Sequence, residues 1–531
     1  MPDISAMLLH QTLESTARRC PQKVALVSEG QRLTYADVEA RVATLAALLQ
    51  LCGVRHGDRV ATFLENGIDA VVAIYATMKC GAVFMPINPL TRRDKLAYLL
   101  NDARVSALIS QPALRNEYDG ALDQNRTVHT LLAGGLVNER NAANAAHVNA
   151  GPTVAVRPEL TKKARIPGDG STLSFGSLHS IDQDLASIIY TSGSTGEPKG
   201  VMLTHLNMLS AARSISEYLE LRDDEVILCA LPLAFDYGLY QVLMGFMVGA
   251  TVVLERSFAF PVKVLEVMAR ERVTVFPGVP TMFSLLMNLT TISEYDTGSL
   301  RTITNTAAAL SEEHIRRLRG LFPAARLFSM YGLTECKRVT YLPPEQLDAR
   351  PTSVGRGMPN EEVWLVDEHG QRLPNGSTGE LVIRGSHVMR GYWEKPEATA
   401  ERLRPGPIAG ETILYSGDVF RTDPEGYLYF VARKDDIIKS RGEKVSPREV
   451  ENVLYGMPGV HEVAVIGIDD PVLGQAVKAF VVMQEGCSST EREVIKYCLS
   501  RLESFMAPKQ VAFVESLPKT DTGKIKKTGL G

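Results

Sequence analysis

At 531 residues the chain is longer than a single hydrophobic core usually supports, so two or more domains are expected. A hydrophobic content of 45%, a charged content of 22% and a net charge of -4 are typical of a soluble globular protein. The sequence has no basic tail or stripe that could bind the phosphates of a nucleic acid. We therefore expect no nucleic-acid partner and predict that the partners are small molecules.

The cysteine pattern and the apolar stretches bear on the compartment. Seven cysteines are scattered without a CxxC pair, which favours a reducing compartment over a disulfide framework or a zinc site. Residues 1–19 include Asp3 and only a short apolar run, so no secretory signal is expected. Residues 239–254 are the most apolar stretch, but Gln241 and Gly249 interrupt it and predict a helix followed by a strand. We therefore predict a cytoplasmic protein without a transmembrane segment.

The first hundred residues predict a parallel sheet. Thr34 is placed to cap a helix whose apolar residues share one face. A strand at 59–63, a helix at 69–79 and a strand at 83–86 follow in the order of a βαβ unit. A further helix is predicted at 93–101 and a further strand at 105–109. Residues 133–180 lose this order and predict a long surface loop without chemistry.

A glycine- and hydroxyl-rich loop lies between two predicted strands and is suited to phosphate. Its glycines let backbone amides turn toward an anion, its hydroxyls add donors, and Lys199 adds a positive charge. The members of the loop are Thr191, Ser192, Gly193, Ser194, Thr195 and Gly196. A flexible surface turn is the alternative, but it would not need the flanking strands or the pair Pro198-Lys199. The loop lacks the Gly-Lys-Ser/Thr ending of a Walker A motif, which argues against a P-loop kinase.

Residues 189–203 resemble the signature loop of the adenylate-forming superfamily, which includes acyl-CoA synthetases, luciferase-like enzymes and the adenylation domains of peptide synthetases. The resemblance implies that the loop holds the β- and γ-phosphates of ATP while a carboxylate attacks the α-phosphorus. Residues 33–35 and 78–83 are similar to the first two structural motifs of the same superfamily.

Beyond the loop, strands alternate with helices again, and the residues at the ends of these strands are the candidates for binding the substrate. Ligands of open α/β sheets bind at strand ends. Phe235 and Asp236 follow the strand at 226–233, and Gly278 follows the strand at 273–276. In amino-acid-activating relatives, an aspartate matching Asp236 holds the ammonium group of the substrate. The alternative is that Asp236 caps the next helix.

Residues 328–335 match the superfamily's Tyr-Gly-x-Thr-Glu motif. The resemblance makes Tyr331 a face for adenine, Thr334 a donor to the α-phosphate and Glu335 the magnesium ligand. A lone Thr-Glu pair would instead be a helix cap, but its position after a strand and a tyrosine favours function. The neighbouring Cys336 is expected to be a small packing residue.

The last third predicts a small β-barrel or twisted sheet, a hinge and a second domain. Residues 363–393 are rich in strand formers punctuated by glycine. The resemblance then makes Asp418 and Arg433 ribose contacts and Asp435 the hinge, which divides the chain into domains 1–434 and 435–531. The second domain interleaves strands and helices as α+β and ends with Lys524, which matches the catalytic lysine of the superfamily.

The predicted fold is therefore α/β, with a large N-terminal domain of βαβ-type sheets, a small β-barrel-like part and a mobile α+β C-terminal domain. The implied reaction uses ATP and Mg²⁺ to form an acyl-AMP and pyrophosphate. The acyl group then passes to the phosphopantetheine thiol of CoA or of a carrier protein, after the small domain rotates about Asp435 and removes Lys524.

Two versions of this ligase remain open from sequence. Asp236 favours an amino acid loaded onto a carrier protein, whereas the general run of the sequence and the lack of a fused carrier domain favour a fatty- or aryl-CoA synthetase. A catalytically silent nucleotide-binding protein is a distant alternative, because Lys199, Glu335 and Lys524 are all present.

Overall fold

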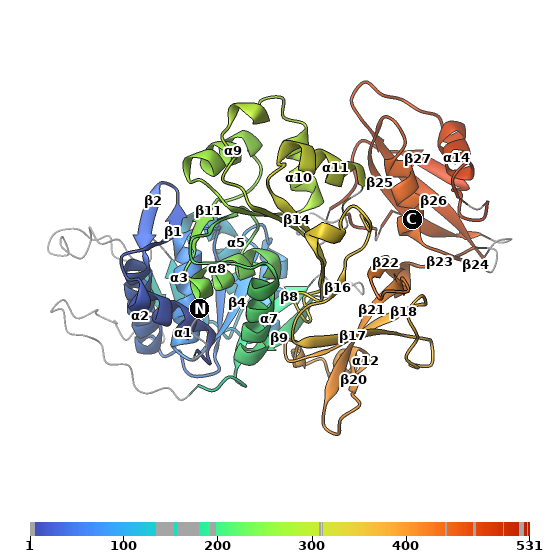
Figure 1. The fold of residues 1–531 in the computed structure, drawn as a ribbon. Coiled ribbons are helices and arrows are strands. Elements are labelled where there is room, and N and C mark those ends of the chain that lie inside the picture. The colour runs from blue at the N-terminus through green and yellow to red at the C-terminus, as the bar shows by residue number, and fades with distance from the viewer. Residues whose placement is uncertain are drawn as a thin grey trace.

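The computed structural model describes residues 6–133, 153–156, 180–191, 198–306, 310, 312–440, 443–470, 474–502, 504–519, 525–527 and 529–530. These residues form two large sheets with helices, a smaller antiparallel sheet and a C-terminal part with its own sheet (Figure 1). The predicted α/β class is confirmed.

In the part of the chain that the structure describes, the first sheet has nine strands, of which the central ones are parallel. Antiparallel strands lie at its two edges. In spatial order the strands are β16 (Arg356–Gly357), β15 (Thr340–Leu342), β14 (Arg326–Tyr331), β13 (Thr302–Asn305), β12 (Val275–Gly278), β10 (Val226–Cys229), β11 (Thr251–Leu254), β1 (Val24–Ser28) and β2 (Gln31–Thr34).

The second sheet, as far as its residues are described, has eight strands and contains the predicted βαβ unit. In spatial order these are β19 (Gly391–Tyr392), β9 (Lys199–Thr204), β8 (Leu185–Thr191), β4 (Val83–Ile87), β3 (Arg59–Phe63), β5 (Ala107–Ser110), β6 (Thr130–Ala133) and β7 (Thr153–Val156). Strand β7 corrects the expectation of an unstructured loop at 133–180, since it pairs with β6 and extends the sheet. Residues 134–152 and 157–179 lie outside the described part.

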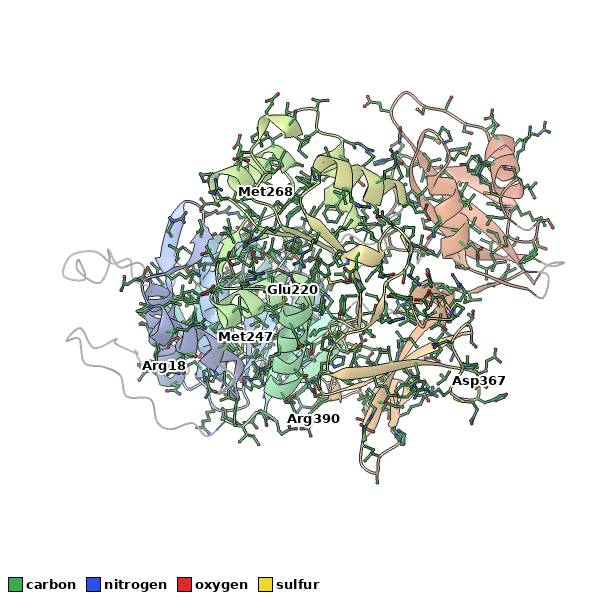
Figure 2. All side chains as sticks on the ribbon, viewed as in Figure 1. Arg18, Glu220, Met247, Met268, Asp367 and Arg390 are labelled. Atoms are coloured by element: carbon green, nitrogen blue, oxygen red, sulfur yellow. The ribbon has the colours of Figure 1, made fainter. Side chains whose placement is uncertain are left out.

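Helices pack on both sheets and on one another, and the largest apolar core lies among them. Helix α8 (Asp236–Val248) packs on β10 and β11, and α3 (Ile68–Lys79) packs on β3 and β4. Helix α7 (His205–Tyr218) contacts both β8 and α8. Every residue of α8 from Tyr237 to Val248 is buried, as expected of a helix enclosed on all sides. Met247 on α8 and Met268 on α9 belong to this core (Figure 2).

The helix boundaries follow local signals in the sequence. The Thr34 hydroxyl accepts a hydrogen bond from the backbone amide of Asp37, so the predicted cap is confirmed. The helices are α1 (Leu9–Arg19), α2 (Tyr35–Leu51), α3 (Ile68–Lys79), α4 (Arg93–Asp102), α5 (Arg115–Leu122), α7 (His205–Tyr218), α8 (Asp236–Val248), α9 (Pro261–Arg270), α10 (Pro280–Met287), α11 (Glu312–Leu321), α12 (Pro396–Arg402), α13 (Pro447–Tyr455) and α14 (Glu491–Leu499).

The predicted β-barrel-like part is a five-stranded antiparallel sheet that does not close among the described residues. Strand β21 pairs with β18, β20 and β22, while β17 pairs, among the described residues, with β18 alone and forms an edge. No described pairing joins the two edges, so of the two predicted forms, a β-barrel or a twisted sheet, the structure has the open sheet and the barrel is corrected. Its strands are β17 (Glu361–Val366), β18 (Thr378–Gly385), β20 (Leu403–Pro405), β21 (Thr412–Thr422) and β22 (Leu428–Arg433).

The C-terminal part begins after the short 3₁₀ turn η5 (Lys434–Asp436). It has the predicted α+β composition and its own apolar cluster. Its strands are β23 (Ile438–Ser440), β24 (Glu443–Val445), β25 (Val460–Asp470), β26 (Gly474–Met483) and β27 (Gln510–Phe513). Strand β25 lies beside α11 in Figure 1, and His461 in β25 acts electrostatically on His314 of α11.

All seven cysteines are free thiols. In the described part of the chain, no helix combines the length and apolar character that crossing a bilayer requires.

Candidate functional site

The predicted site residues lie where the two large sheets approach each other. Strands β10, β12, β13 and β14 are neighbours in the first sheet, and their carboxyl ends lead to the loops that carry the substrate-side and adenine-side residues. The second sheet contributes the β8–β9 hairpin. Such a place, where loops from several strands meet, is where α/β sheets bind ligands.

The phosphate loop joins two paired strands, as predicted. Thr191 at the end of β8 stands opposite Lys199 at the start of β9. Gly200 is required next to them, because an added Cβ would lie 2.7 Å from Cγ2 of Ile188. The predicted loop members Ser192, Gly193, Ser194, Thr195 and Gly196 lie outside the described residues.

A tyrosine that the sequence analysis had not selected connects this hairpin to the first sheet. The Lys199 ammonium lies 5.5 Å from the ring centroid of Tyr392 in β19. The hydroxyl of the same Tyr392 donates a hydrogen bond of 2.7 Å to Oε1 of Glu335. Strand β19 reaches this position by pairing with β9, with Gly391 opposite Met202. Lys199 and Glu335, the cation and the carboxylate of the predicted triphosphate site, therefore both contact the side chain of Tyr392.

The loop from Tyr331 to Arg338 holds Glu335 in a fixed backbone arrangement. The backbone amide of Lys337 donates to the carbonyl of Leu333 at 2.7 Å, and that of Val339 donates to the carbonyl of Tyr331. Gly332 cannot be replaced without movement, since an added Cβ would lie 1.9 Å from the carbonyl oxygen of Lys337. Thr334 and Glu335 are both half-buried here.

Magnesium would fit this carboxylate together with bound phosphates. The described residues contain no group of three or more His, Cys, Asp or Glu side chains that could enclose a metal ion. Mg²⁺ is commonly held by one or two carboxylates, water and substrate phosphates, so one oriented carboxylate suits it. Glu335 is such an oriented carboxylate, because the Tyr392 hydroxyl donates a hydrogen bond to it.

The predicted ribose contacts lie together beside the adenine-side tyrosine. The Tyr331 hydroxyl donates to Oδ2 of Asp418 at 2.6 Å, and Nε of Arg433 lies 3.5 Å from Oδ1 of Asp418. Asp418 and Arg433 are opposed residues of β21 and β22. Burial, with the adjacent Asp418 carboxylate, raises the pKa of Tyr331 well above its ordinary value. The tyrosine therefore stays protonated and acts as a donor.

The acyl-side residues also cluster, but Asp236 has a partner in the protein. Phe235 is the residue before α8, and Asp236 is the first helical residue, so the alternative in which Asp236 caps α8 is wrong. Its Oδ2 lies 3.7 Å from Nη1 of the buried Arg338. The Arg338 guanidinium lies over the ring of Tyr237, 4.5 Å from its centroid. Gly278 is packed against Phe283, whose ring an added Cβ would meet at 2.6 Å.

Lys337 is a second buried cation in this region. It is 1% exposed, and its ammonium has no hydrogen-bond partner in the described part of the chain. Burial lowers the pKa of Lys337 to about 8, with the charges of Asp236 and Glu335 opposing the shift. Cys336 is fully buried, and burial raises the pKa of its thiol, which fits the expected packing role.

Two predicted residues of the C-terminal part receive no side-chain description. Lys524 lies outside the described residues. Asp435 lies within η5, at the junction between β22 and β23, but its side chain is not described. Their roles stay predictions.

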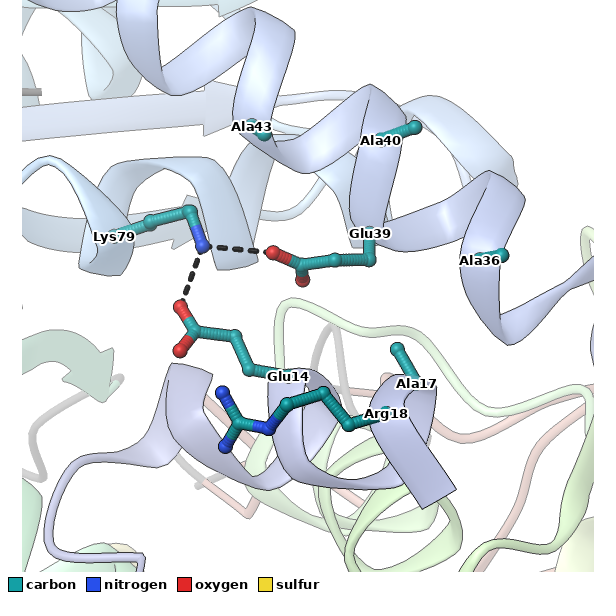
Figure 3. Close-up of a pocket in the computed structure, with 8 residues that line it drawn as sticks. All are labelled: Glu14, Ala17, Arg18, Ala36, Glu39, Ala40, Ala43 and Lys79. Carbon is teal, nitrogen blue, oxygen red and sulfur yellow. Dashed lines mark hydrogen bonds and ion pairs between the residues drawn. The ribbon is translucent and has the colours of Figure 1, made fainter. Parts of the chain in front are cut away.

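A cleft of about 480 Å³ lies elsewhere, between α1 and α2 (Figure 3). Lys79 on its wall lies 2.5 Å from Glu14 and 2.7 Å from Glu39, so these three charges are paired with one another. The lining residues are Glu14, Ala17, Arg18, Ala36, Glu39, Ala40, Ala43 and Lys79. None of them belongs to the strand-end loops described above.

Comparison with known proteins identifies the family. The AMP-binding enzyme profile matches residues 13–393, and the profile of the AMP-binding enzyme C-terminal domain matches residues 449–524. The chain belongs to the AMP-binding enzyme family. This AMP-binding enzyme is therefore an AMP-forming ligase, which makes an acyl-AMP from ATP and a carboxylic acid and passes the acyl group to a thiol.

Named relatives resemble this AMP-binding enzyme over nearly its whole length. A long-chain-fatty-acid–CoA ligase of Bacillus subtilis is 31% identical over 97% of this chain and 93% of its own. A feruloyl-CoA synthase of Amycolatopsis is 36% identical over 96% of each. The crystal structure of ATP-bound MatB from Rhodopseudomonas palustris has a TM-score of 0.85 and 29% identity, covering 100% of this chain and 98% of that one.

Proposed function

We propose that the protein couples a small carboxylic acid to CoA, with Mg²⁺-ATP as the activating substrate. The observation that carries the proposal is the position of Tyr392, which contacts the cation of the phosphate hairpin and the candidate magnesium ligand Glu335 at once. The triphosphate and the metal ion would then be bound between the two large sheets, by residues that lie far apart in the sequence.

The proposed roles on the nucleotide follow from charge and donor type. Lys199 and the loop 191–196 would bind the β- and γ-phosphates, and Thr334 would donate to the α-phosphate. Mg²⁺ on Glu335 would offset the charge that develops as the carboxylate attacks phosphorus. Asp418 would accept the ribose hydroxyls, with Arg433 beside it and Tyr331 against the adenine. All of these groups act by positioning and charge.

The proposed second step uses the C-terminal part. Lys524 would contribute its charge to adenylate formation and then leave, as residues 435–531 rotate about Asp435 and admit the thiol. We favour CoA as the acceptor because the full-length relatives are named as CoA ligases or synthases. Loading of an amino acid onto a carrier protein is less favoured, because Asp236 is within 3.7 Å of Arg338 rather than open to a substrate ammonium group.

A two-stage assay tests this function. Purified protein with Mg²⁺ and a panel of fatty, aryl, dicarboxylic and amino acids should exchange labelled pyrophosphate into ATP with at least one acid, and should form a thioester when CoA is added. Lys524→Ala should lose most of the exchange. Failure of exchange with every acid would reject the proposal, and exchange followed by transfer only to a carrier protein would reject CoA as the acceptor.

A further inference from the structure

Three buried polar atoms at the carboxyl end of the first sheet have no hydrogen-bond partner among the described residues. They are Nζ of Lys337, Nε of Arg338 and Oγ1 of Thr306. Their residues are 1%, 4% and 3% exposed, so bulk water does not satisfy them. A buried donor without an acceptor costs about 1–3 kcal/mol, and more when it is charged. A folded protein rarely keeps such groups together unless something else binds them.

The three residues belong to neighbouring loops. Thr306 follows β13, Lys337 and Arg338 follow β14, and these strands pair along the sheet. Tyr237 connects this group to α8, because its hydroxyl bonds to Thr304 in β13 while its ring lies beneath the Arg338 guanidinium. Asp236 contacts the same guanidinium from the start of α8. The unpartnered donors therefore share the acyl side of the site.

The charge balance of this group is positive. Asp236 contacts Arg338 and acts electrostatically on Lys337, and its position at the start of α8 is already favourable for negative charge. The charge of Glu335 also acts on Lys337, but Glu335 is bonded to Tyr392 and belongs to the phosphate side, where bound Mg²⁺ would offset it. The nearby Glu361 and His387 form a buried pair with 2.9 Å between Oε2 and Nε2. Burial raises the pKa of Glu361 and lowers that of His387, so both favour their uncharged forms.

This balance distinguishes among the classes of acid. A plain alkyl or aryl tail would leave the buried donors unpaired, and a substrate ammonium would add a third cation. A site built around hydrogen-bonding groups discriminates strongly against ligands that lack the matching group. An anionic substituent would satisfy Lys337 and restore neutrality.

We propose that the acid carries a second carboxylate, distant from the reacting one, and that Lys337 binds it with support from Arg338 and Thr306. The inference rests on the proposed function, since it names the substrate class of the same site. It makes Lys337 a specificity-determining residue for the acid.

Acids matched in size test the proposal on the unmodified protein. Pyrophosphate exchange should be at least tenfold faster in kcat/KM with adipic than with hexanoic acid, or with terephthalic than with benzoic acid, and 6-aminohexanoic acid should be poor. Equal rates with the paired acids, or a preference for the amino acid, would overturn the inference while leaving the ligase function intact. Exchange with none of them or of the wider panel would instead reject the ligase function.

Variants then assign the effect to Lys337. Lys337→Met should reduce the diacid-to-monoacid ratio of kcat/KM by tenfold or more, and Lys337→Arg should restore part of it. A ratio unchanged in Lys337→Met, with all acids slowed equally, would show that Lys337 serves the common reaction and would overturn the assignment. The wild-type ratio decides the substrate class even if the variant is unstable.

Discussion

The Tyr392 hydroxyl donates to the Glu335 carboxylate across 2.7 Å, although Tyr392 lies in the second sheet and Glu335 in the loop between β14 and β15 of the first. Replacing Tyr392 with Phe should remove this bond and keep the ring beneath Lys199. Because hydrogen bonds to charged groups contribute about 1.5–3 kcal/mol, the Mg²⁺ concentration for half-maximal exchange should rise about tenfold. Tyr497→Phe, which removes a tyrosine hydroxyl bond in α14, is the matched control and should leave it unchanged. Equal Mg²⁺ dependence in both variants would contradict the role of Tyr392.

Asp418→Asn should weaken nucleotide binding through the ribose. The change keeps the size of the side chain but removes the negative charge that strengthens the hydrogen bonds accepted from the ribose hydroxyls, so the KM for ATP should rise roughly tenfold to a hundredfold. Wild type should discriminate against 2′-deoxy-ATP, and the variant should do so much less. Asp423→Asn, which disturbs the contact with Arg350 just after the end of β21, is the control. Undiminished discrimination in the Asp418 variant would place the ribose elsewhere.

Gly332→Ala should displace the loop that carries Glu335. The new methyl would overlap the carbonyl oxygen of Lys337, which the backbone cannot avoid without moving. We expect a loss of about 2–4 kcal/mol in the free energy of unfolding and at least tenfold slower adenylate formation. Gly320→Ala lies in α11 with no atom within 4 Å of its Cβ and should instead gain about 0.5–1 kcal/mol. Urea unfolding of both variants gives the comparison.

The free energy of unfolding should fall in mild acid because His205 is buried in its uncharged form. Burial, with nearby His10, lowers the pKa of His205 to about 3, and its Nδ1 accepts a hydrogen bond from the backbone amide of Leu9. In the unfolded chain the imidazole of His205 binds a proton near pH 6.5, whereas in the folded protein it stays neutral until about pH 3. The contribution of the neutral, buried ring to the free energy of unfolding is therefore complete above pH 6.5 and is lost as the pH falls. By pH 5 the loss reaches roughly 2 kcal/mol.

His205→Asn supplies the control for this effect, because Asn can accept the Leu9 amide and does not titrate. Its free energy of unfolding should therefore fall less between pH 7 and pH 5 than that of wild type. Parallel slopes would mean that His10 or the Asp184 carboxylate, whose pKa values are also lowered in the folded protein, dominates instead.

Asp435→Pro should separate the two half-reactions. Proline fixes its own backbone and restricts Lys434 before it, which limits rotation at η5. Pyrophosphate exchange should stay within about threefold of wild type, while thioester formation should fall more than tenfold. Asp435→Ala, which leaves the backbone free, should affect neither step strongly. Equal loss of both steps in the proline variant would argue against a hinge at this residue.

Local signals in the sequence predicted the elements well. The cap at Thr34 and the strands on either side of the phosphate loop depend on residues within a few positions of one another, and the structure confirms both. The short strand β7 was missed because it lies in a stretch whose composition shows no alternation. The sequence could not decide between a β-barrel and a twisted sheet, because strand formers do not reveal whether the last strand pairs with the first, and the structure has the sheet.

The site was predictable where a motif carries it and not where distant segments meet. The resemblance supplied Tyr331, Asp418 and Arg433, which the fold brings together. Tyr392 was missed because its role depends on pairing with β9, far earlier in the chain. The one available signal was its place in an aromatic pair directly after Gly391. The partner of Asp236 was equally invisible, since Arg338 reaches it from another strand end.

The pairing of β19 with β9 also affects how the protein can be divided. The Trp393 amide donates to the carbonyl of Gly200, and Arg390 donates to Met202, so this late segment covers the outer edge of the hairpin. An expression fragment ending before residue 390 would leave that edge with unsatisfied backbone groups and open to pairing with other chains. Fragments intended to isolate the nucleotide-binding half should therefore extend past Trp393 to remain monodisperse.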